Sequence, residues 1–492
     1  MPVPPPIVSL NLGSQTLGLA KFQAQPKGGL VLTGYRLHQI LADPAAETDR
    51  KRQIGDALPA MMRELGLKPG PVDYAVSGQS VFTRFVKLPA VDQEKIERII
   101  TFEAQQNVPF PIDEVVWDYQ LVGSDALDQI EVVLVAIKTE LLEGINAAVE
   151  TSGLRTTRVD VATMALYNAF RFNYGELKGC SLVIDIGART TNLLFVEPGR
   201  FFSRSIPIGG TSVTSAIAKE FNETFDAAEK RKRHGGFVRL GGASAEADNP
   251  EVARLSKLVR NTMTRLHAEV ARSISFYRAQ QQESQPKRVF LCGGAVTTCY
   301  MREFFHEKLQ LPVEFLNPLR NVVVAESVVL QEATRSAHLL GELVGLALRG
   351  TMNCPMELNL RPASVVRRQR LAQRQPFVVL AVACFLLGLL AWAFYFMRVA
   401  QVDRRMADTL QVDVDRMRGF DIRIKRLIQE TATLDAGARP LLRTIDDRET
   451  WLRILDDLNQ RLPKENIWIT ELAPTSEGRI VGNPGAAGAN SL

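Results

Sequence analysis

Glycine-containing turns occur at three places where the residue types could hold phosphate groups. They read NLGSQT from Asn11, DIGART from Asp185 and CGGA from Cys292. Each turn follows a short apolar run that predicts a β-strand, and a second such run follows the first two turns. Glycine lets backbone N–H groups approach phosphate oxygens closely. An aspartate at the end of a strand, such as Asp185, can hold Mg²⁺ through water.

Each turn alone would also suit an ordinary hairpin, but the three in this order predict an α/β nucleotide-binding fold with two lobes. Residues for nucleophilic catalysis form no recognisable pattern, because no histidine lies beside a serine or cysteine in a known catalytic motif. The five cysteines include no CxxC pair, which argues against a disulfide framework or a zinc site. These observations favour a scaffold over an enzyme.

Composition sets broad limits on the class of protein. The chain has 492 residues, a length typical of about three domains. Its 46% hydrophobic and 23% charged residues are ordinary for a globular protein. The net charge of +5 is small for this length, so it does not argue for nucleic acid. We expect no nucleic-acid partner.

One uncharged apolar run, FVVLAVACFLLGLLAWAFYFM at 377–397, is 21 residues long. As a helix with a rise of about 1.5 Å per residue, it would cover the roughly 30 Å hydrocarbon core of a membrane. A buried core helix is the alternative, but such helices usually carry polar residues on one face. Trp392 and Tyr395 lie toward the far end, as interfacial aromatic residues often do. The first residues, MPVPPPIVSL, lack the features of a signal peptide.

Arginines flank the apolar run unequally and predict its orientation. The near side carries Arg361, Arg367, Arg368, Arg370 and Arg374, and the far side carries Arg398, Arg404 and Arg405. Because positive charge is retained on the cytoplasmic side, we expect the N-terminal part in the cytoplasm and the C-terminus outside it. The chain would contact membrane lipid through a single span.

The part before the span resembles the PilM family, the actin-like cytoplasmic proteins of type IV pilus assembly, and more distantly FtsA. The resemblance rests on PFPIDEVVWDYQ from Pro109, on DIGART followed by IPIGG, and on GLALRG from Gly345. It covers roughly residues 5–350. It implies a two-lobed, actin-like (ribonuclease-H-like) α/β ATPase fold at 1–350, with an inserted subdomain at about 80–155.

The resemblance also implies that ATP and Mg²⁺ bind between the two lobes. By motif, the first phosphate loop is Gly13, Ser14, Gln15 and Thr16; the second is Asp185, Gly187, Thr190 and Thr191; the nucleoside residues are Glu229 and Lys232; the adenosine loop is Gly293 and Gly294. Asp185 would hold the metal through water. Lys230 to Arg233 could instead be a solvated basic run.

The sequence departs from the family pattern at the first hairpin. Asn11 stands where the family has an acidic residue, and Gly18 stands where it has a lysine. An amide cannot supply the negative charge that offsets Mg²⁺, and loss of such an interaction commonly costs a few kcal/mol. The segment AVTTCYM after Gly294 also lacks the usual later glycine. We therefore expect ATP binding with little or no hydrolysis.

The segment MELNLRP from Met356 resembles the cytoplasmic tail of PilN, a partner of PilM. Leu358, Asn359, Leu360 and Pro362 match the tail motif, whereas Arg361 replaces its usual leucine. An ordinary polar linker is the alternative. The order of a tail and basic linker at 351–376, followed by the span, suggests PilM fused to a PilN-like segment, with Met356 a relic of a second start.

In the family pair, the tail lies extended in a groove of PilM beside the inserted subdomain. The link Gly350–Pro355 reaches at most about 20 Å. We expect the groove to lie farther away, so that each tail docks in a neighbouring molecule and the protein forms oligomers. Docking in the same molecule is the alternative.

Beyond the span, apolar residues recur every three or four positions over 398–435. They are Val399, Val402, Met406, Leu410, Val414, Met417, Ile424, Leu427, Ile428 and Leu434. This spacing predicts an amphipathic helix that forms a coiled coil with a PilO-like protein or a second copy. The remainder, 436–492, resembles the opening of the ferredoxin-like domain of PilN. We expect it to form about half of such a domain, which either is completed by a partner or is degenerate.

The favoured function is a scaffold of type IV pilus assembly in the bacterial inner membrane, with a cytoplasmic N-terminal domain and a periplasmic C-terminus. Its partners would be a PilO-like protein, other pilus assembly components and a cytoplasmic motor ATPase. Two alternatives are a component resembling GspL of type II secretion, which has a similar layout, and a membrane-tethered ATPase or kinase of the actin-fold group.

Overall fold

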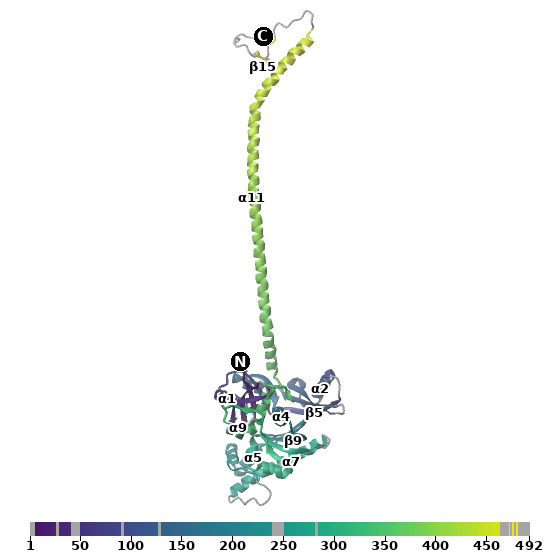
Figure 1. Ribbon diagram of the computed structural model, residues 1–492, viewed down its shortest axis with the longest axis vertical. Helices are drawn as coiled ribbons and strands as arrows, with labels where there is room; N and C mark the ends of the chain where they lie inside the picture. Colours follow the sequence, from purple (N-terminus) through teal and green to yellow (C-terminus); the bar gives the residue numbers. More distant parts are fainter. Residues whose placement is uncertain are drawn as a thin grey trace. The chain divides into compact units, whose positions relative to one another are not determined.

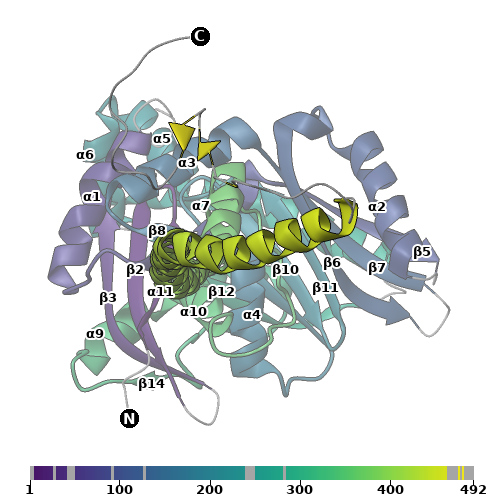
Figure 2. The same ribbon diagram turned by 90° about the horizontal axis from the view of Figure 1, so that it is seen from above.

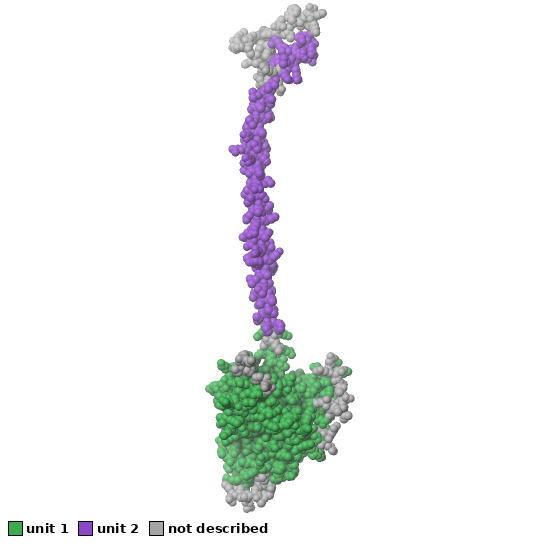
Figure 3. All heavy atoms as spheres, viewed as in Figure 1, with its two compact units in different colours: residues 1–375 green, residues 376–492 purple. Residues whose placement is uncertain are grey.

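The computed structural model forms two compact units, residues 1–375 and 376–492, which are described separately (Figure 3). The structure describes residues 5–25, 29–40, 50–89, 93–125, 129–238, 250–280, 284–462, 472, 475–476 and 479–480. Unit 1 (1–375) holds three sheets and most of the helices. Unit 2 (376–492) consists mainly of helix.

The first sheet of unit 1 has the strand order β14-β3-β2-β1-β4-β8. Its strands are β1 (Ile7–Leu12), β2 (Thr16–Ala24), β3 (Leu30–Gln39), β4 (Pro71–Val76), β8 (Arg155–Val161) and β14 (Val323–Val324). The first three form an antiparallel meander, and β4 and β8 add in parallel beside β1. β8 is therefore a strand at the sheet's edge.

The second sheet repeats this pattern with the order β11-β10-β9-β12-β13. Its strands are β9 (Cys180–Ile186), β10 (Thr191–Glu197), β11 (Arg200–Ile206), β12 (Pro286–Cys292) and β13 (Val313–Phe315). Again three antiparallel strands precede two parallel ones. All residues of β9 are buried, as expected for a central strand covered on both faces. The two hairpins and the two-lobed α/β architecture predicted from the sequence are confirmed.

A third, antiparallel sheet lies between β4 and β8 in the sequence, with the order β5-β7-β6 (Figure 2). Its strands are β5 (Phe82–Pro89), β6 (Val115–Asp125) and β7 (Gln129–Lys138). Alternate residues of β7 serve two cores: Val132, Leu134 and Ala136 pack with α2 (Gln93–Asn107), and Val133, Val135 and Ile137 belong to the main core. This double burial explains why β7 reads as a continuous apolar run.

Helices cover and connect these sheets. They are α1 (Arg50–Glu64), α3 (Thr139–Thr151), α4 (Ala162–Tyr174), α5 (Gly210–Phe221), α6 (Phe225–Gly235), α7 (Pro250–Gln280), α8 (Met301–Leu309), α9 (Leu330–Ser336) and α10 (Gly341–Leu348), with short 3₁₀ turns at Gly78–Ser80, Ile112–Glu114, Gly294–Thr297 and Ala337–Leu339. Every residue of α10 is buried. A Cβ at Gly345 would lie 1.7 Å from the carbonyl oxygen of Ala165, so α10 and α4 pack with their backbones in contact.

The helix α11 (Ala363–Arg461) is 99 residues long and begins in unit 1 (Figure 1). Among the described residues it is the one helix long and apolar enough to cross a membrane, by length and composition. It does not end near residue 435, as the sequence analysis expected, but continues through Gly419 and Pro440. Beyond it, β15 (Thr475–Ser476) and β16 (Arg479–Ile480) form a short hairpin. Most of the expected ferredoxin-like segment beyond the helix lies outside the described residues.

Candidate functional site

A cavity of about 460 Å³ in unit 1 is bordered by the turns of both hairpins, by α6, by the turn after β12 and by the first turn of α10. This volume suits a small-molecule ligand. Of the residues predicted to bind a cofactor, the following line it: Gly13, Ser14, Gln15, Thr16, Asp185, Gly187, Thr190, Glu229, Lys232, Gly293 and Gly294. Thr191 is the exception, because it is fully buried and its hydroxyl donates to the Ile208 carbonyl oxygen at 2.7 Å.

The first loop is tight, and its backbone is held by an arginine that the sequence analysis did not identify. A Cβ at Gly13 would lie 2.5 Å from the Thr16 carbonyl oxygen, so the turn requires glycine. Arg50 donates to the carbonyl oxygens of Leu12 at 3.1 Å and Ser14 at 3.3 Å, and also to that of Gly13. Burial, together with the nearby Arg189, lowers the pKa of Arg50 to about 10.

Gln15 in the same loop is buried, and its Nε2 has no hydrogen-bond partner among the described residues. Buried amide donors are normally satisfied, so an unpaired one beside a cavity suits a bound acceptor. Gln15 thus gives the first loop a donor for an anionic group.

Asp185 is the next-to-last residue of β9, beside the second loop, and is held by its neighbour across the hairpin. Asn192 Nδ2 donates to its Oδ2 at 2.8 Å, and Ser205 donates to Asn192 Oδ1 at 2.7 Å. Burial raises the pKa of Asp185 to about 6. Gly293, with φ of +91°, must be glycine because a Cβ there would lie 2.4 Å from Asp185 Oδ1. The adenosine-loop candidate therefore lies directly against this carboxylate.

Glu229 and Lys232 on α6 form a buried ion pair of 2.7 Å at the cavity wall. Lys232 also donates to Thr214 Oγ1 at 2.9 Å and to the Gly210 carbonyl oxygen at 3.1 Å. Burial alone would raise the pKa of Glu229, but Lys232 holds it below its usual value. The alternative of a solvated basic run fits Lys230, which is exposed and pairs with Asp226, but it does not fit Lys232.

The two hairpins place different residues at corresponding positions. Asn11 lies opposite Gly18 in the first hairpin, and Asp185 lies opposite Asn192 in the second. All four line the cavity. Where the second hairpin has the Asp185 carboxylate, the first hairpin has the Asn11 amide. Where the second hairpin has Asn192, whose amide binds that carboxylate, the first hairpin has Gly18.

Glu342, on α10, also lines the cavity and was missed by the sequence analysis. Burial, together with Asp185, raises its pKa to about 8. The available signal was a single acidic residue in the otherwise uncharged run LLGELVGLAL. Only the tertiary structure shows that this residue lies near Asp185.

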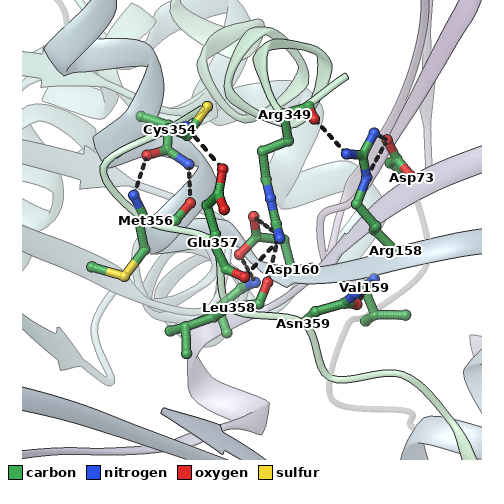
Figure 4. Close-up of polar contacts among 12 residues, drawn as sticks. Asp73, Arg158, Val159, Asp160, Arg349, Cys354, Met356, Glu357, Leu358 and Asn359 are labelled. Carbon is green, nitrogen blue, oxygen red and sulfur yellow. Dashed lines mark hydrogen bonds and ion pairs between the residues drawn. The ribbon is translucent and has the colours of Figure 1, made fainter. Parts of the chain in front are cut away.

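The segment 356–362 lies docked on its own chain, between β8, α4 and β6 (Figure 4). The side chains of Met356, Leu358 and Leu360 are fully buried in the main core of unit 1. The side-chain amide of Asn168 on α4 binds the Met356 backbone at both ends, donating to its carbonyl oxygen at 2.7 Å and accepting from its N–H at 3.0 Å. Pro362 is buried as well.

Asn359 joins the docked segment to the edge of the first sheet. Its Oδ1 accepts from the Val159 N–H at 3.0 Å, and its own N–H donates to Asp118 at 2.7 Å. The Leu360 N–H donates to the Val159 carbonyl oxygen at 2.8 Å. The segment thus meets the edge strand β8 through one backbone hydrogen bond and one hydrogen bond to a side chain, a contact similar to β-augmentation but without an added strand.

Arg349, at the C-terminal end of α10, holds the other side of the docked segment (Figure 4). It forms a buried ion pair of 2.8 Å with Asp160, and it donates to the carbonyl oxygens of Glu357, at 2.8 Å, and Leu358. Burial raises the pKa of Asp160 although Arg349 opposes the shift. One guanidinium therefore joins α10, β8 and the docked segment.

The expectation that the segment docks in a neighbouring molecule is wrong for this structure. The groove does not lie on the far side of the inserted subdomain but begins at the end of α10, where Arg349 reaches Glu357 and Leu358. The six-residue link Gly350–Pro355 therefore suffices. After the segment, the first turns of α11 pair with α3, through Ser364 with Glu143 at 2.7 Å and Arg368 with Glu150 at 2.9 Å.

The N-terminal part of the chain is similar to proteins of type IV pilus assembly. A family model described as "Type IV pilus assembly protein PilM" matches residues 10–351. A solved PilM–PilN type IV pilus biogenesis complex contains a chain 24% identical, covering 70% of this chain and 99% of that one, with a TM-score of 0.61. This likeness confirms the predicted fold class of the N-terminal part.

Two further solved structures are more distant. MreB5 of Spiroplasma citri bound to AMPPNP is 14% identical, covers 70% of this chain and 95% of that one, and has a TM-score of 0.36. The cytoplasmic domain of EpsL, an inner-membrane component of the type II secretion system of Vibrio cholerae, is 6% identical, covers 73% and 100%, and has a TM-score of 0.32.

Proposed function

Since the chain belongs to the family of the type IV pilus assembly protein PilM, we propose that it is an inner-membrane scaffold of a type IV pilus machine. It links a cytoplasmic nucleotide-binding domain through a single span to partners in the periplasm. The observation that carries this proposal is the docked segment. Residues 356–362 lie in the groove of a PilM-type domain, and α11, which contains the apolar run, begins at the next residue.

The solved complex whose name joins PilM and PilN supports this arrangement. In the present chain, the PilN-like tail and the PilM-type domain belong to one polypeptide. A ligand tethered by a short link has an effective concentration in the millimolar range, so docking does not depend on the concentration of a separate partner. The domain is thereby attached to the membrane helix in every molecule.

The cavity is proposed to bind ATP with Mg²⁺. The loop Gly13–Thr16 and the loop after Asp185 would hold the phosphates, Glu229 and Lys232 would approach the nucleoside, and Gly293 and Gly294 would approach the adenosine. Asp185 would hold the cation through water. Mg²⁺ neutralises phosphate charge when bound. We propose slow hydrolysis or none, because Asn11 supplies no negative charge.

Mg-ATP is expected to raise the melting temperature of the full chain in detergent, and Asp185→Ala is expected to abolish that rise. A ligand at about 100 times its Kd stabilises the folded state by about 2.7 kcal/mol. Glu114→Ala, an exposed change in the inserted subdomain, serves as the control and should leave the rise intact. An equal shift in the Asp185→Ala variant, or rapid phosphate release by the wild type, would contradict the proposal.

The apolar stripe of α11 is proposed to pair with a PilO-like protein or a second copy. Its residues Met406, Leu410, Met417 and Ile424 are all exposed in the described chain. Their spacing of four and seven positions is that of a coiled-coil seam. A cytoplasmic motor ATPase is a further proposed partner of the assembly.

Replacing Leu410 and Met417 by aspartate is expected to abolish cross-linking of α11 to its partner in native membranes, because it places two charges in the apolar seam. Thr409→Asp with Arg416→Asp has the same spacing on the neighbouring positions and should preserve cross-linking. Mass spectrometry of the cross-linked products identifies the partner. Unchanged yields in the seam variant would show that the stripe is not an interface, and secretion-system subunits among the products would refute the pilus assignment.

A further inference from the structure

Glu342 is a buried carboxylate that the proposed nucleotide site has not yet used. It lies in the first turn of α10, whose remaining residues are apolar or glycine and are buried in the core. Its exposed fraction is 9%, and its residue lines the same cavity as Asn11 and Asp185. The neighbouring Leu343 contacts the first hairpin, since a Cβ at Gly18 would lie 3.0 Å from its side chain. Glu342 therefore enters the cavity where the two hairpins meet.

In the part of the chain that the structure describes, no cationic side chain pairs with the Glu342 carboxylate, and the hydrogen bond that it accepts comes from its own backbone N–H. A buried carboxylate without a cationic partner is costly when it is ionised. Asp185, the other carboxylate at this wall, is paired only with the Asn192 amide among the described groups. Two buried carboxylates that line one cavity, with no cationic side chain bound to either among the described residues, are stabilised by uptake of a proton or by a positively charged ligand.

The donor set suits a hard divalent cation. Carboxylate oxygens, together with an amide oxygen such as that of Asn11, are the ligands that Mg²⁺ and Mn²⁺ prefer. Groups of three or more His, Cys, Asp or Glu that could form a complete metal site are absent from the described residues. This is consistent with Mg²⁺, which usually binds one or two carboxylates and completes its shell with water and phosphate.

We propose that Glu342 and Asp185 together hold a divalent cation at the phosphate end of the cavity, and that Glu342 supplies the negative charge that Asn11 lacks. The inference rests on the proposed binding of ATP for its phosphate ligands. It adds a metal-positioning role for a residue of α10. Because Arg349 at the other end of α10 holds the docked segment, the cation and the segment are bound by opposite ends of one buried helix.

The test measures Mn²⁺ binding to the full chain in detergent by electron paramagnetic resonance, with and without ATP. Glu342→Gln keeps the size of the side chain and removes its charge, so Mn²⁺ affinity should fall by at least about tenfold. Affinity for ATP in EDTA should stay the same or rise, because a negative charge near the phosphates is lost. Glu332→Gln, an exposed change on α9, serves as the matched control.

A double variant that moves the negative charge from α10 to the first hairpin tests the inference further. Asn11→Asp in the Glu342→Gln background returns a carboxylate to the first hairpin and should restore most of the Mn²⁺ affinity. Equal Mn²⁺ affinity of wild type and Glu342→Gln, or no recovery in the double variant, would overturn the inference.

If the wild type binds no nucleotide, the proposed binding of ATP fails, and the inference is judged on Mn²⁺ alone. Loss of Mn²⁺ binding in Glu342→Gln would then support it, whereas a wild type that binds no Mn²⁺ would refute it.

Discussion

Replacing Arg349 by methionine is expected to lower the free energy of unfolding of unit 1 by about 3–5 kcal/mol, because it leaves the fully buried Asp160 without its counter-ion. The same change removes the donor to the carbonyl oxygens of Glu357 and Leu358, so the docked segment should also be released. Chemical denaturation of the full chain in detergent measures the first effect. Limited proteolysis at residues 356–362 measures the second.

Two further variants distinguish the effect of breaking the Arg349–Asp160 ion pair from the effect of removing any arginine. Arg361→Met removes an exposed arginine of the same segment, whose side chain bonds only Gln369 among the described residues, and should change stability by less than about 1 kcal/mol. Adding Asp160→Asn to Arg349→Met removes the uncompensated charge and should recover part of the loss. If Arg349→Met unfolded at the wild-type denaturant concentration, the ion pair would have no structural role.

Replacing Leu358 and Leu360 together by aspartate is expected to undock the segment while leaving the rest of the domain folded. Both side chains are fully buried, and truncating a buried leucine already costs about 2–5 kcal/mol before any charge is introduced. Proteolysis within 356–362 should therefore become faster by about 100-fold or more, which corresponds to about 2.7 kcal/mol. Leu371→Asp, at an exposed position of α11, is the control and should leave the rate unchanged.

A synthetic peptide MELNLRPAS distinguishes docking in the same molecule from docking in a neighbour. The wild-type groove is occupied by its own chain, so it should not bind the peptide, whereas the Leu358→Asp, Leu360→Asp variant should bind it. Peptide binding of equal strength by both proteins, with equal protease sensitivity, would mean that the segment is an ordinary linker.

Local patterns were sufficient for the hairpins and their loops. Apolar runs around NLGSQT and DIGART predict strand, turn and strand because the information lies within about 16 residues of sequence. The placement of Gly13 to Thr16 beside Asp185 and Gly293 followed from the family resemblance. Thr191 shows the limit of carrying residues over from a family motif. Side chains alternate between the two faces of β10, so that of Thr191 is buried in the protein rather than directed toward the cavity.

The contributions of Arg50, Asn192 and Glu342 could not be predicted, because each depends on packing between segments far apart in the chain. The docking of the segment in its own groove also depended on such information. The sequence gives the length of the link Gly350–Pro355. It does not show that the packing of the buried helix α10 places the start of this link close to β8. The continuation of α11 beyond residue 435 was missed because the resemblance of 436–492 to PilN suggested a new element there.

The docked segment also determines how mechanical load enters the domain. The docked segment lies between α11 and the link Gly350–Pro355. Tension along α11 would therefore act first on the hydrogen bonds that the segment makes with Val159, Asn168 and Arg349, and only then on the link. The anchored residues share that tension among a sheet edge and two buried helices, so no single bond bears it. Tension applied through α11 would thus reach α10, whose first turn carries Glu342 at the border of the cavity.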